Sequence, residues 1–301
     1  MAPFAAMSTI QARFDAAADR YRTWWEPVLA PTALALLNEI ALPSAGADAE
    51  VPHSGLGATE PGPGAARILD LGTGAGLLAL AAVRRWPRAI VVGLDGSTGM
   101  LAVGAAAAER QLTESEYSRL EFVSGHASRL PFEDATFDIV ISSFVLQLVP
   151  HRPSALAEAR RVLRPGGRLA FVTWLVGSDD PFAPDEAFEQ ALDELEIDEE
   201  GEAEEARSGD FASAAAAAGQ LRRAGFREVQ AREAALIHHF DPATYLDFLE
   251  RYSERDVFES LDEQARARLR AAAAARLARL PREAFTWQAP VVYASGRRST
   301  G

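Results

Sequence analysis

The stretch Ile68-Leu69-Asp70-Leu71-Gly72-Thr73-Gly74-Ala75-Gly76 decides the fold of this chain. A short apolar run contains one acidic residue, and three glycines alternate in the turn that leads into the helical pattern at 76–86. Glycine permits positive φ and lets the backbone come close to a ligand. The N-terminus of the following helix offers unpaired N–H groups. The segment therefore predicts a ligand-binding turn between a buried strand and a helix, with a plain glycine-rich turn as the alternative.

Strand and helix patterns alternate after this turn. The apolar strand patterns cover 67–71, 89–95, 120–125, 137–144 and 168–174, and helical patterns cover 76–86, 97–111 and 153–163. Apolar strands that alternate with amphipathic helices are typical of a parallel sheet covered on both faces. The sequence therefore predicts a doubly wound α/β fold.

A second signal for a ligand is Asp95, which ends the second strand pattern. A carboxylate at that place can accept hydrogen bonds from both hydroxyls of a ribose, or it can cap the next helix. The dinucleotide fingerprint G-x-G-x-x-G would require a third glycine at Leu77, but Gly76 comes one residue early. The turn and Asp95 together predict a site for a nucleoside-bearing cofactor at the switch point of the sheet.

The segment before the sheet divides into two helical patterns and a linker. Apolar and aromatic residues recur at helical spacing over 8–25, Pro27 is expected to end that helix, and a short helix follows Pro31. Residues 42–66 are rich in Gly, Pro and Ala without periodicity, which predicts a flexible linker. We expect 1–41 to form a helical lid.

The segment after the fifth strand is strongly acidic. Of the 32 residues at 179–210, 15 are Asp or Glu, against the single Arg207. Such a run is typical of a solvated helix or loop, and the alternative is a mobile lid or an electrostatic filter against anionic substrates. Later patterns predict helices at 212–224, near Asp241 and at 261–280, and strands at 226–234 and 287–295. Pro290 suggests an edge or bulge position for the last strand.

The composition excludes several classes of protein. Among 301 residues with a net charge of −13 there is no cysteine, and all 30 basic residues are arginine. Disulfides, thiol nucleophiles, cysteine-bound metals, and Schiff-base or P-loop lysines are therefore excluded. The acidic balance argues against nucleic acid as a partner. No apolar run reaches the ~18 residues of a membrane span, so we expect a soluble, cytoplasmic protein.

Four segments resemble the successive motifs of class I S-adenosylmethionine-dependent methyltransferases. They are ILDLGTGAG (68–76), VGLDGSTGML (92–101), LPFEDATFDIVISSFVLQLV (130–149) and ALAEARRVLRPGGRLAF (155–171). They look most like the subgroup of ubiquinone/menaquinone biosynthesis C-methyltransferases (methyltransferase type 11), and the resemblance covers about 66–175. It implies S-adenosylmethionine as cofactor and a Rossmann-like, seven-stranded sheet with an antiparallel last strand.

The resemblance implies roles for residues near the methionine half of the cofactor. The turn formed by Gly72, Thr73, Gly74 and Gly76 would face this half, and Asp70 would lie near its ammonium group. From the N-terminal helix, Tyr21 would meet the carboxylate. The aromatic stripe that includes Tyr21 has core packing as its alternative role.

Other matches concern the nucleoside half. Asp95 and the adjoining Gly96 would hold the ribose, and Met100 would pack near the adenine or serve as a core residue. The family often places an Asp and a small residue after the third strand, where this chain has His126 and Ala127. The histidine could accept a hydrogen bond from the adenine amino group or be an exposed loop residue.

The end of the fourth strand carries Ser142 and Ser143, on the family's route from cofactor to substrate. The histidine common in this subgroup is replaced by Gln147, which resembles the glutamine of carboxyl-directed relatives. The catalytic residues are left open: Gln147 is a candidate through this resemblance, and the candidates for a general base are His151, and His238 or His239. Each histidine has a structural or surface role as its alternative.

A set of apolar and aromatic side chains within 241–280 could form the roof of the acceptor pocket or pack against one another. It comprises Tyr245, Phe248, Leu249, Tyr252 and Phe258. We expect the methyltransferase domain to span 67–301, with an acidic insertion at 179–220 and a helical cap at 241–282. The predicted activity is methyl transfer to a small organic acceptor, on oxygen or carbon. The alternatives are an NAD(P)-dependent oxidoreductase and a non-catalytic cofactor-binding scaffold; the oligomeric state is left open.

Overall fold

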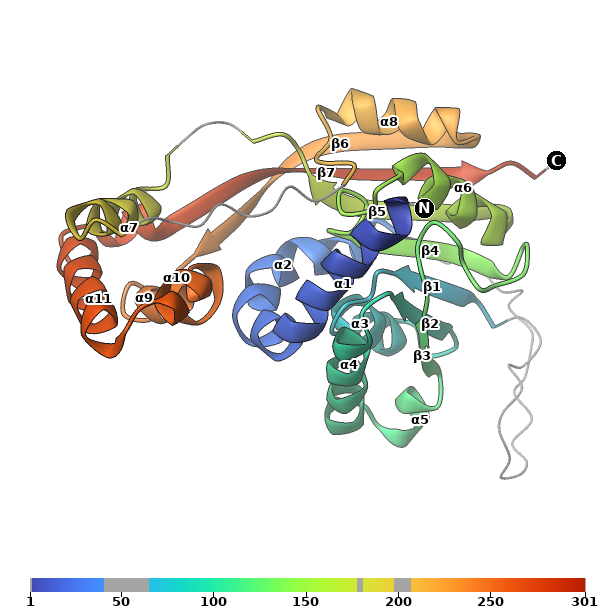
Figure 1. Cartoon of the computed structure of the whole chain (residues 1–301). Coiled ribbons are helices and arrows are strands. Elements are labelled where there is room, and N and C mark those ends of the chain that lie inside the picture. Colours follow the sequence, from blue (N-terminus) through green and yellow to red (C-terminus); the bar gives the residue numbers. More distant parts are fainter. Residues whose placement is uncertain (1, 41–64, 178–180, 198–206, 301) are drawn as a thin grey trace.

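The computed structural model describes residues 2–40, 65–177, 181–197 and 207–300. The linker predicted over 42–66 lies outside the described residues except for its last two positions, and so does part of the acidic stretch. The described chain forms one sheet with helices on both faces and a helical bundle beyond one end of that sheet (Figure 1).

The sheet has seven strands in the order β3-β2-β1-β4-β5-β7-β6. Strands β1 to β5 run parallel, whereas β7 is antiparallel to both of its neighbours, β5 and β6. The predicted fold, mostly parallel with an antiparallel last strand, is confirmed. The strands are β1 (Arg67–Leu71), β2 (Ile90–Asp95), β3 (Leu120–Ser124), β4 (Phe137–Ser143), β5 (Leu163–Trp174), β6 (Phe226–His239) and β7 (Thr286–Arg298).

Each central strand buries apolar side chains on both faces. In β1, Ile68 packs on one face, and Leu69 and Leu71 pack on the other. Helices α2 (Glu26–Leu36) and α3 (Leu77–Arg85) cover the first face, and α6 (Arg152–Val162) and α8 (Ala214–Arg223) cover the second. A fully buried aliphatic side chain contributes about 1.5–3 kcal/mol, so this double burial stabilises the sheet. Helices α4 (Thr98–Gln111) and α5 (Glu114–Tyr117) connect β2 to β3.

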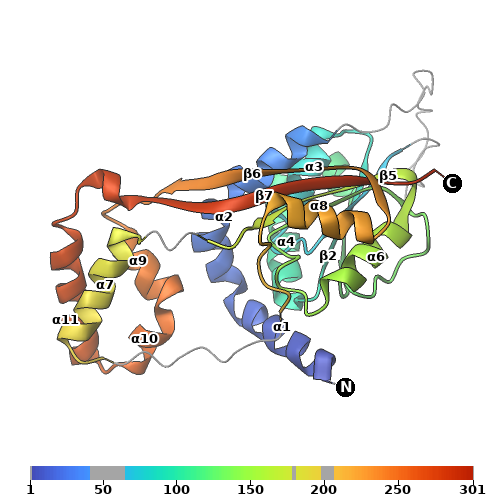
Figure 2. The same cartoon turned by 90° about the horizontal axis from the view of Figure 1, so that it is seen from above.

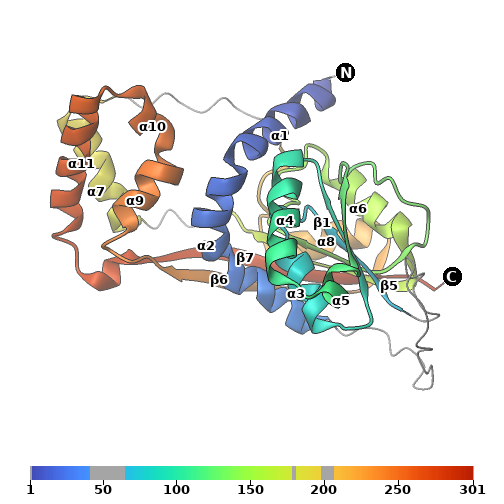
Figure 3. The ribbon, with the colours of Figure 1, turned by 90° about the horizontal axis from the view of Figure 1, so that it is seen from below.

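The N-terminal segment is one bent helical path. Helix α1 (Ala2–Arg20) continues through the π-helical turn η1 (Tyr21–Trp25) into α2 and the short η2 (Leu37–Glu39). The predicted stop at Pro27 is wrong, because this proline lies in the first turn of α2, where a missing N–H costs no helical hydrogen bond. In Figures 1 and 3 the path runs between the sheet and the helical bundle.

Strands β6 and β7 are longer than predicted and continue past the end of β5 as a two-stranded ribbon (Figure 2). The ribbon leads to a bundle with its own apolar core. The acidic insertion predicted over 179–220 divides, because α7 joins this bundle whereas α8 packs on β6 and β7. The bundle contains α7 (Ala183–Glu194), α9 (Tyr245–Phe248), η3 (Leu249–Ser253), α10 (Arg255–Ser260) and α11 (Glu263–Leu277), and η4 (Arg282–Phe285) precedes β7.

Pro290, for which an edge or bulge position is predicted, lies in the interior strand β7 at the point where its pairing with β5 has ended. Its carbonyl accepts a hydrogen bond from Leu175 N, so its nitrogen also faces the β5 side. The β5 pairing ends at Trp174 and Val291. The missing N–H therefore interrupts no hydrogen bond between β6 and β7.

Candidate functional site

The glycine turn between β1 and α3 has the backbone that its sequence predicts. Gly72 and Gly76 have φ values of 73° and 87°, which side chains other than glycine rarely adopt. A Cβ on Gly72 would lie 2.3 Å from a methyl group of Val145, whereas one on Gly74 would meet no atom within 4 Å. The Val145 side chain therefore packs against the turn at Gly72, whereas the turn is open at Gly74.

Asp95 lies opposite this turn and holds it in place. One carboxylate oxygen, Oδ2, accepts a hydrogen bond from Gly74 N at 2.8 Å, and Oδ1 accepts one from Ser97 N at 2.9 Å. Burial raises the pKa of this carboxyl, and the backbone N–H groups oppose that rise. Since a carboxylate offers about four acceptor sites and backbone N–H groups of Gly74, Gly96 and Ser97 act on this one, Asp95 keeps capacity for a further donor such as a ribose hydroxyl.

Asp70 supports the turn from below. Its side chain is 1% exposed, and its Oδ2 accepts a hydrogen bond from Thr73 Oγ1 at 2.7 Å. Burial raises the pKa of Asp70 to about 7, although this hydrogen bond lowers it. The side chains of Asp70 and Thr73 do not line the pocket that Gly72 and Gly74 line. Gly76 begins α3 and likewise lies behind the turn.

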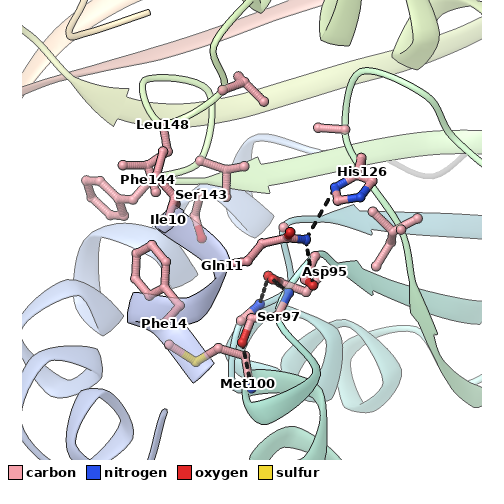
Figure 4. A pocket seen from close by; sticks show the side chains of 18 of the residues that line it. Ile10, Gln11, Phe14, Asp95, Ser97, Met100, His126, Ser143, Phe144 and Leu148 are labelled. Carbon is pink, nitrogen blue, oxygen red and sulfur yellow. Dashed lines mark hydrogen bonds between the residues drawn. The ribbon is translucent and has the colours of Figure 1, made fainter. Parts of the chain in front are cut away.

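A pocket opens at the carboxyl ends of the parallel strands (Figure 4). Eight of the twelve residues predicted for the cofactor lie in its wall: Tyr21, Gly72, Gly74, Asp95, Gly96, Met100, His126 and Ala127. The fold therefore brings together residues that are separated by more than 100 positions in the chain.

The first helix closes one side of this pocket. Ile10, Gln11 and Phe14 belong to the wall. One turn along, Asp15 Oδ1 accepts hydrogen bonds from Ser97 Oγ at 2.5 Å and Gly99 N at 2.7 Å. These contacts fix α1 on the loop that follows β2.

A further contact joins the helical path to the glycine turn. Arg22 Nη1 donates to the carbonyl oxygen of Ala75 at 2.8 Å and lies 4.0 Å from the Glu26 carboxylate. The neighbouring Tyr21 lines the pocket. Burial, and next the Tyr252 phenol, raise the pKa of Tyr21 above its usual value of 10.0, so this phenol is neutral at physiological pH.

The two serines at the end of β4 point to different environments. Ser143 lines the pocket, whereas Ser142 is buried and donates to the carbonyl oxygen of Leu71 at 2.8 Å. The resemblance places both serines on the route from cofactor to substrate, and strand alternation explains why Ser143 faces the pocket whereas Ser142 does not. Phe144 follows with a φ of 54°. A strained non-glycine residue of this kind is typical of functional sites.

The candidate catalytic residues Gln147 and His151 lie outside the pocket wall. Gln147 is buried, where its Nε2 donates to Phe144 O at 2.8 Å and its Oε1 accepts from Thr173 Oγ1. His151 caps α6, with its Nδ1 2.8 Å from Ser154 Oγ. The contact of His151 corresponds to the structural alternative weighed for the histidines.

The two histidines of β6 are on the ribbon. His238 packs edge-on against the Phe240 ring, and burial lowers its pKa. His239 Nδ1 lies 3.0 Å from Thr286 Oγ1. Neither lines the described pocket, because the ribbon carries them past the end of β5 toward the bundle.

The aromatic residues predicted as a roof pack mainly against one another. Tyr245 is 2% exposed, and its ring contacts those of Phe182, Phe240 and Phe285. Its hydroxyl donates to Asp185 Oδ1 at 2.5 Å. None of the residues within 241–280 that were candidates for the roof lies in the described pocket wall. They pack against one another in the bundle instead, which was the alternative role.

Sequence reasoning missed Gln11, Asp15 and the segment from Phe144 to Pro150 as parts of the site. One signal was available in the second motif, where Gly96 and Gly99 flank Ser97. A Cβ on Gly96 would lie 2.5 Å from Gln11 Nε2, and one on Gly99 would lie 2.9 Å from the Asp15 carbonyl oxygen. Both glycines therefore make room for the first helix.

The comparisons with known proteins agree with this geometry. Residues 69–171 match the family model described as a methyltransferase domain. The ubiquinone/menaquinone biosynthesis C-methyltransferase UbiE of Dinoroseobacter shibae is 44% identical over 105 residues, which are 35% of this chain and 41% of that protein. The malonyl-[acyl-carrier protein] O-methyltransferase of Xylella fastidiosa is 36% identical over 124 residues, 41% of this chain and 39% of that protein. The chain thus spans about two fifths of the length of these curated relatives.

Solved structures show the same fold over most of the chain. The protein BH2331 of Bacillus halodurans superposes with a TM-score of 0.52 at 21% identity, covering 89% of this chain and all of that one. A Haloferax volcanii structure, a complex with the Trm112 methyltransferase activator, gives a TM-score of 0.53 at 18% identity, covering 95% and 97% of the two chains. These similarities concern the fold alone.

The class that the fold and the motifs resemble is that of the class I S-adenosylmethionine-dependent methyltransferases. Residues 69–171 match a methyltransferase domain, which supports S-adenosylmethionine as the cofactor, as the sequence motifs predict. The particular proteins that the domain resembles are the UbiE C-methyltransferases. Among the described residues, no helix is long and apolar enough to cross a membrane.

Proposed function

We propose that the whole chain is a methyltransferase that transfers a methyl group from S-adenosylmethionine to a small, uncharged organic acceptor, on oxygen or carbon. The observation that carries this proposal is the single pocket shared by Asp95, the open glycine turn and the first helix. The family match over 69–171 supports the cofactor. The alternatives considered from sequence, an NAD(P)-dependent oxidoreductase and a scaffold, have no comparable support.

The chemical character of the acceptor follows from the other part of the pocket wall. Around the polar residues near Asp95, the wall continues with apolar side chains, namely Ile10, Phe14, Phe144, Val145, Leu148, Val149 and Pro150. No arginine is among the described lining residues. A carboxylate or phosphate acceptor would need a cation or several donors there, so this wall favours an apolar, neutral acceptor.

The bound cofactor supplies an activated methyl group. The residues of this chain then have to hold the acceptor in line and exclude water, which can contribute roughly 7–11 kcal/mol without a strong base. The N-terminal helical path, fixed through Asp15 of α1 and Arg22 of η1, closes the pocket for this purpose. Among the described lining residues, the ionisable side chains are those of Tyr21, Asp95 and His126. This set supports catalysis by positioning.

We also propose that nucleic acid is not the acceptor, because the net charge of −13 opposes association with a polyanion. Micromolar, salt-sensitive binding to RNA near physiological ionic strength would contradict this proposal. We propose separately that the protein acts in the cytoplasm.

The test of the cofactor site is Asp95→Ala, measured by isothermal titration calorimetry with S-adenosylmethionine and, separately, with NAD. We expect affinity for S-adenosylmethionine to fall more than tenfold, because the variant loses both hydrogen bonding to the ribose and the hydrogen bond that Asp95 accepts from Gly74 N. The melting temperature should not fall much, since burial disfavours the ionised carboxylate in the folded state.

Asp256→Ala is a matched control, because the Asp256 side chain is 95% exposed and outside the described pocket wall. Unchanged affinity in a folded Asp95→Ala protein would contradict the site, and binding of NAD would favour the oxidoreductase. Transfer of a labelled methyl group into a metabolite extract, followed by mass spectrometry, would identify the acceptor. No transfer to any acceptor would favour the scaffold.

A further inference from the structure

Gln11 reaches from the first helix across the pocket to the ends of two strands. Its Nε2 donates to the carbonyl oxygen of Gly96, after β2, at 2.8 Å, and lies 3.3 Å from His126 Nδ1, after β3 (Figure 4). Because a Cβ on residue 96 would lie 2.5 Å from this nitrogen, glycine is needed for the contact. The carboxamide is therefore built into the pocket wall.

The contact with Gly96 also fixes which way the carboxamide points. A carbonyl oxygen accepts and cannot donate, so Nε2 and not Oε1 faces Gly96. Nε2 carries two hydrogens, and its two partners are Gly96 O and His126 Nδ1. Among the residues whose side chains the structure describes, none donates a hydrogen bond to Gln11 Oε1. Oε1 is therefore the atom of this carboxamide that is left to accept a hydrogen bond from a ligand.

We propose that Gln11 selects adenine as the base of the cofactor, an inference that rests on the proposed function. Its Oε1 accepts a hydrogen bond from the 6-amino group, in the pairing of carboxamide and adenine that recurs in base recognition. This residue takes over the task for which the family often uses an Asp after the third strand, where this chain has His126. A 6-oxo base would place a second acceptor against Oε1 and would bind more weakly.

Asp15 provides the matched control. It fixes the same helix through Ser97 and Gly99 but does not line the pocket. Releasing the helix at Asp15 should weaken every ligand that the helix covers, whatever its base. Loss of the Gln11 carboxamide should act on the adenine ligand alone.

The experiment measures binding of two probes by calorimetry, S-adenosyl-L-homocysteine and its 6-oxo analogue S-inosyl-L-homocysteine. A buried acceptor that is left without its donor costs about 5- to 150-fold in affinity, so the wild type should prefer the adenine probe within that range. Gln11→Ala and Gln11→Met, which keeps the length of the side chain, should reduce the preference to less than about threefold through weaker binding of the adenine probe. Asp15→Ala should weaken both probes alike and keep the preference.

Three results would overturn the assignment of Gln11: a wild type that binds both probes equally, variants of Gln11 that keep the wild-type preference, or variants that bind both probes more tightly because a blocking side chain is gone. A wild type that binds neither probe would instead contradict the proposed function. Melting temperatures of all variants establish that each is folded.

Discussion

The parallel part of the sheet and the helical bundle are built in different ways. In the first, β1, the glycine turn and α3 are consecutive in the chain and pack on one another, and residues 69–171 coincide with the matched family model. In the second, contacts join distant segments: Phe188 of α7 stacks on Phe258 of α10, and Tyr245 hydrogen-bonds Asp185. A region with local contacts can be recognised from short motifs, whereas a region with distant contacts cannot.

Aromatic side chains connect the two regions. The Phe144 ring at the pocket lies 4.5 Å from Trp174, Trp174 lies 6.0 Å from Trp287, and Trp287 lies 5.7 Å from Trp25, measured between ring centroids. Trp25 in turn stacks on Tyr252 of the bundle at 5.9 Å. The bundle therefore contacts the pocket through intermediate rings.

The largest effect should follow from Tyr245→Ala in the bundle. Deleting a buried aromatic side chain costs about 3–5 kcal/mol, and the free energy of unfolding measured with urea should fall by that amount. Tyr245→Phe is the control, since it loses only the hydrogen bond to Asp185 and should cost about 1–3 kcal/mol. Affinity for S-adenosylmethionine should not change in either variant. If Tyr245→Ala instead alters the KM of the acceptor at unchanged stability, Tyr245 belongs to the roof and the separation of the regions is wrong.

An intermediate, pH-dependent effect should come from Asp70 beneath the glycine turn. Burial raises its pKa from 3.8 to about 7, so between these values the folded state binds a proton that the unfolded chain releases. The free energy of unfolding therefore decreases as pH rises from about 4 to 7, by up to about 4 kcal/mol from this group. Above pH 7 this contribution is fully lost.

Asp70→Asn removes this titration and keeps an acceptor for Thr73. Urea unfolding of wild type and variant at pH 4.5 and pH 8 should show the variant gaining about 2–4 kcal/mol relative to the wild type at the higher pH. Other buried carboxyls are common to both proteins, so the difference isolates Asp70. An equal difference at the two pH values would show that Asp70 is ionised throughout.

The smallest effect should come from the exposed ion pairs of the bundle. Arg270 joins α11 to Asp247 and Glu250, and its side chain is 43% exposed. Pairs of this kind contribute about 0–1 kcal/mol and are screened by salt. Arg270→Met should therefore lower the free energy of unfolding by less than about 1 kcal/mol in dilute buffer, with the difference from wild type vanishing at 1 M salt. A larger, salt-independent loss would indicate that the bundle depends on this network.

Much of the site could be predicted because its residues lie in or beside strand ends. Asp95, Gly72 and Gly74 follow from the motif, since parallel strands bring their carboxyl ends to one edge of the sheet. The neighbours Ser142 and Ser143 show the limit of this reasoning. A step of one residue along a strand reverses the direction of the side chain, so only the structure tells which of the two faces the pocket.

The amino-acid sequence by itself determined the order of strands and helices, the glycine turn and the carboxylate opposite it, because local backbone preferences and the periodicity of apolar residues are written in adjacent positions. The tertiary structure alone decided that Gln11 and Asp15 meet the loop after β2, about 85 residues away. It also decided that Tyr245 packs in the core of the bundle, that Gln147 donates a hydrogen bond to the carbonyl oxygen of Phe144, and that His151 caps α6. These outcomes depend on which distant segments pack together. That packing is determined by burial and hydrogen bonding summed over the whole fold, and no short segment of the sequence contains this information.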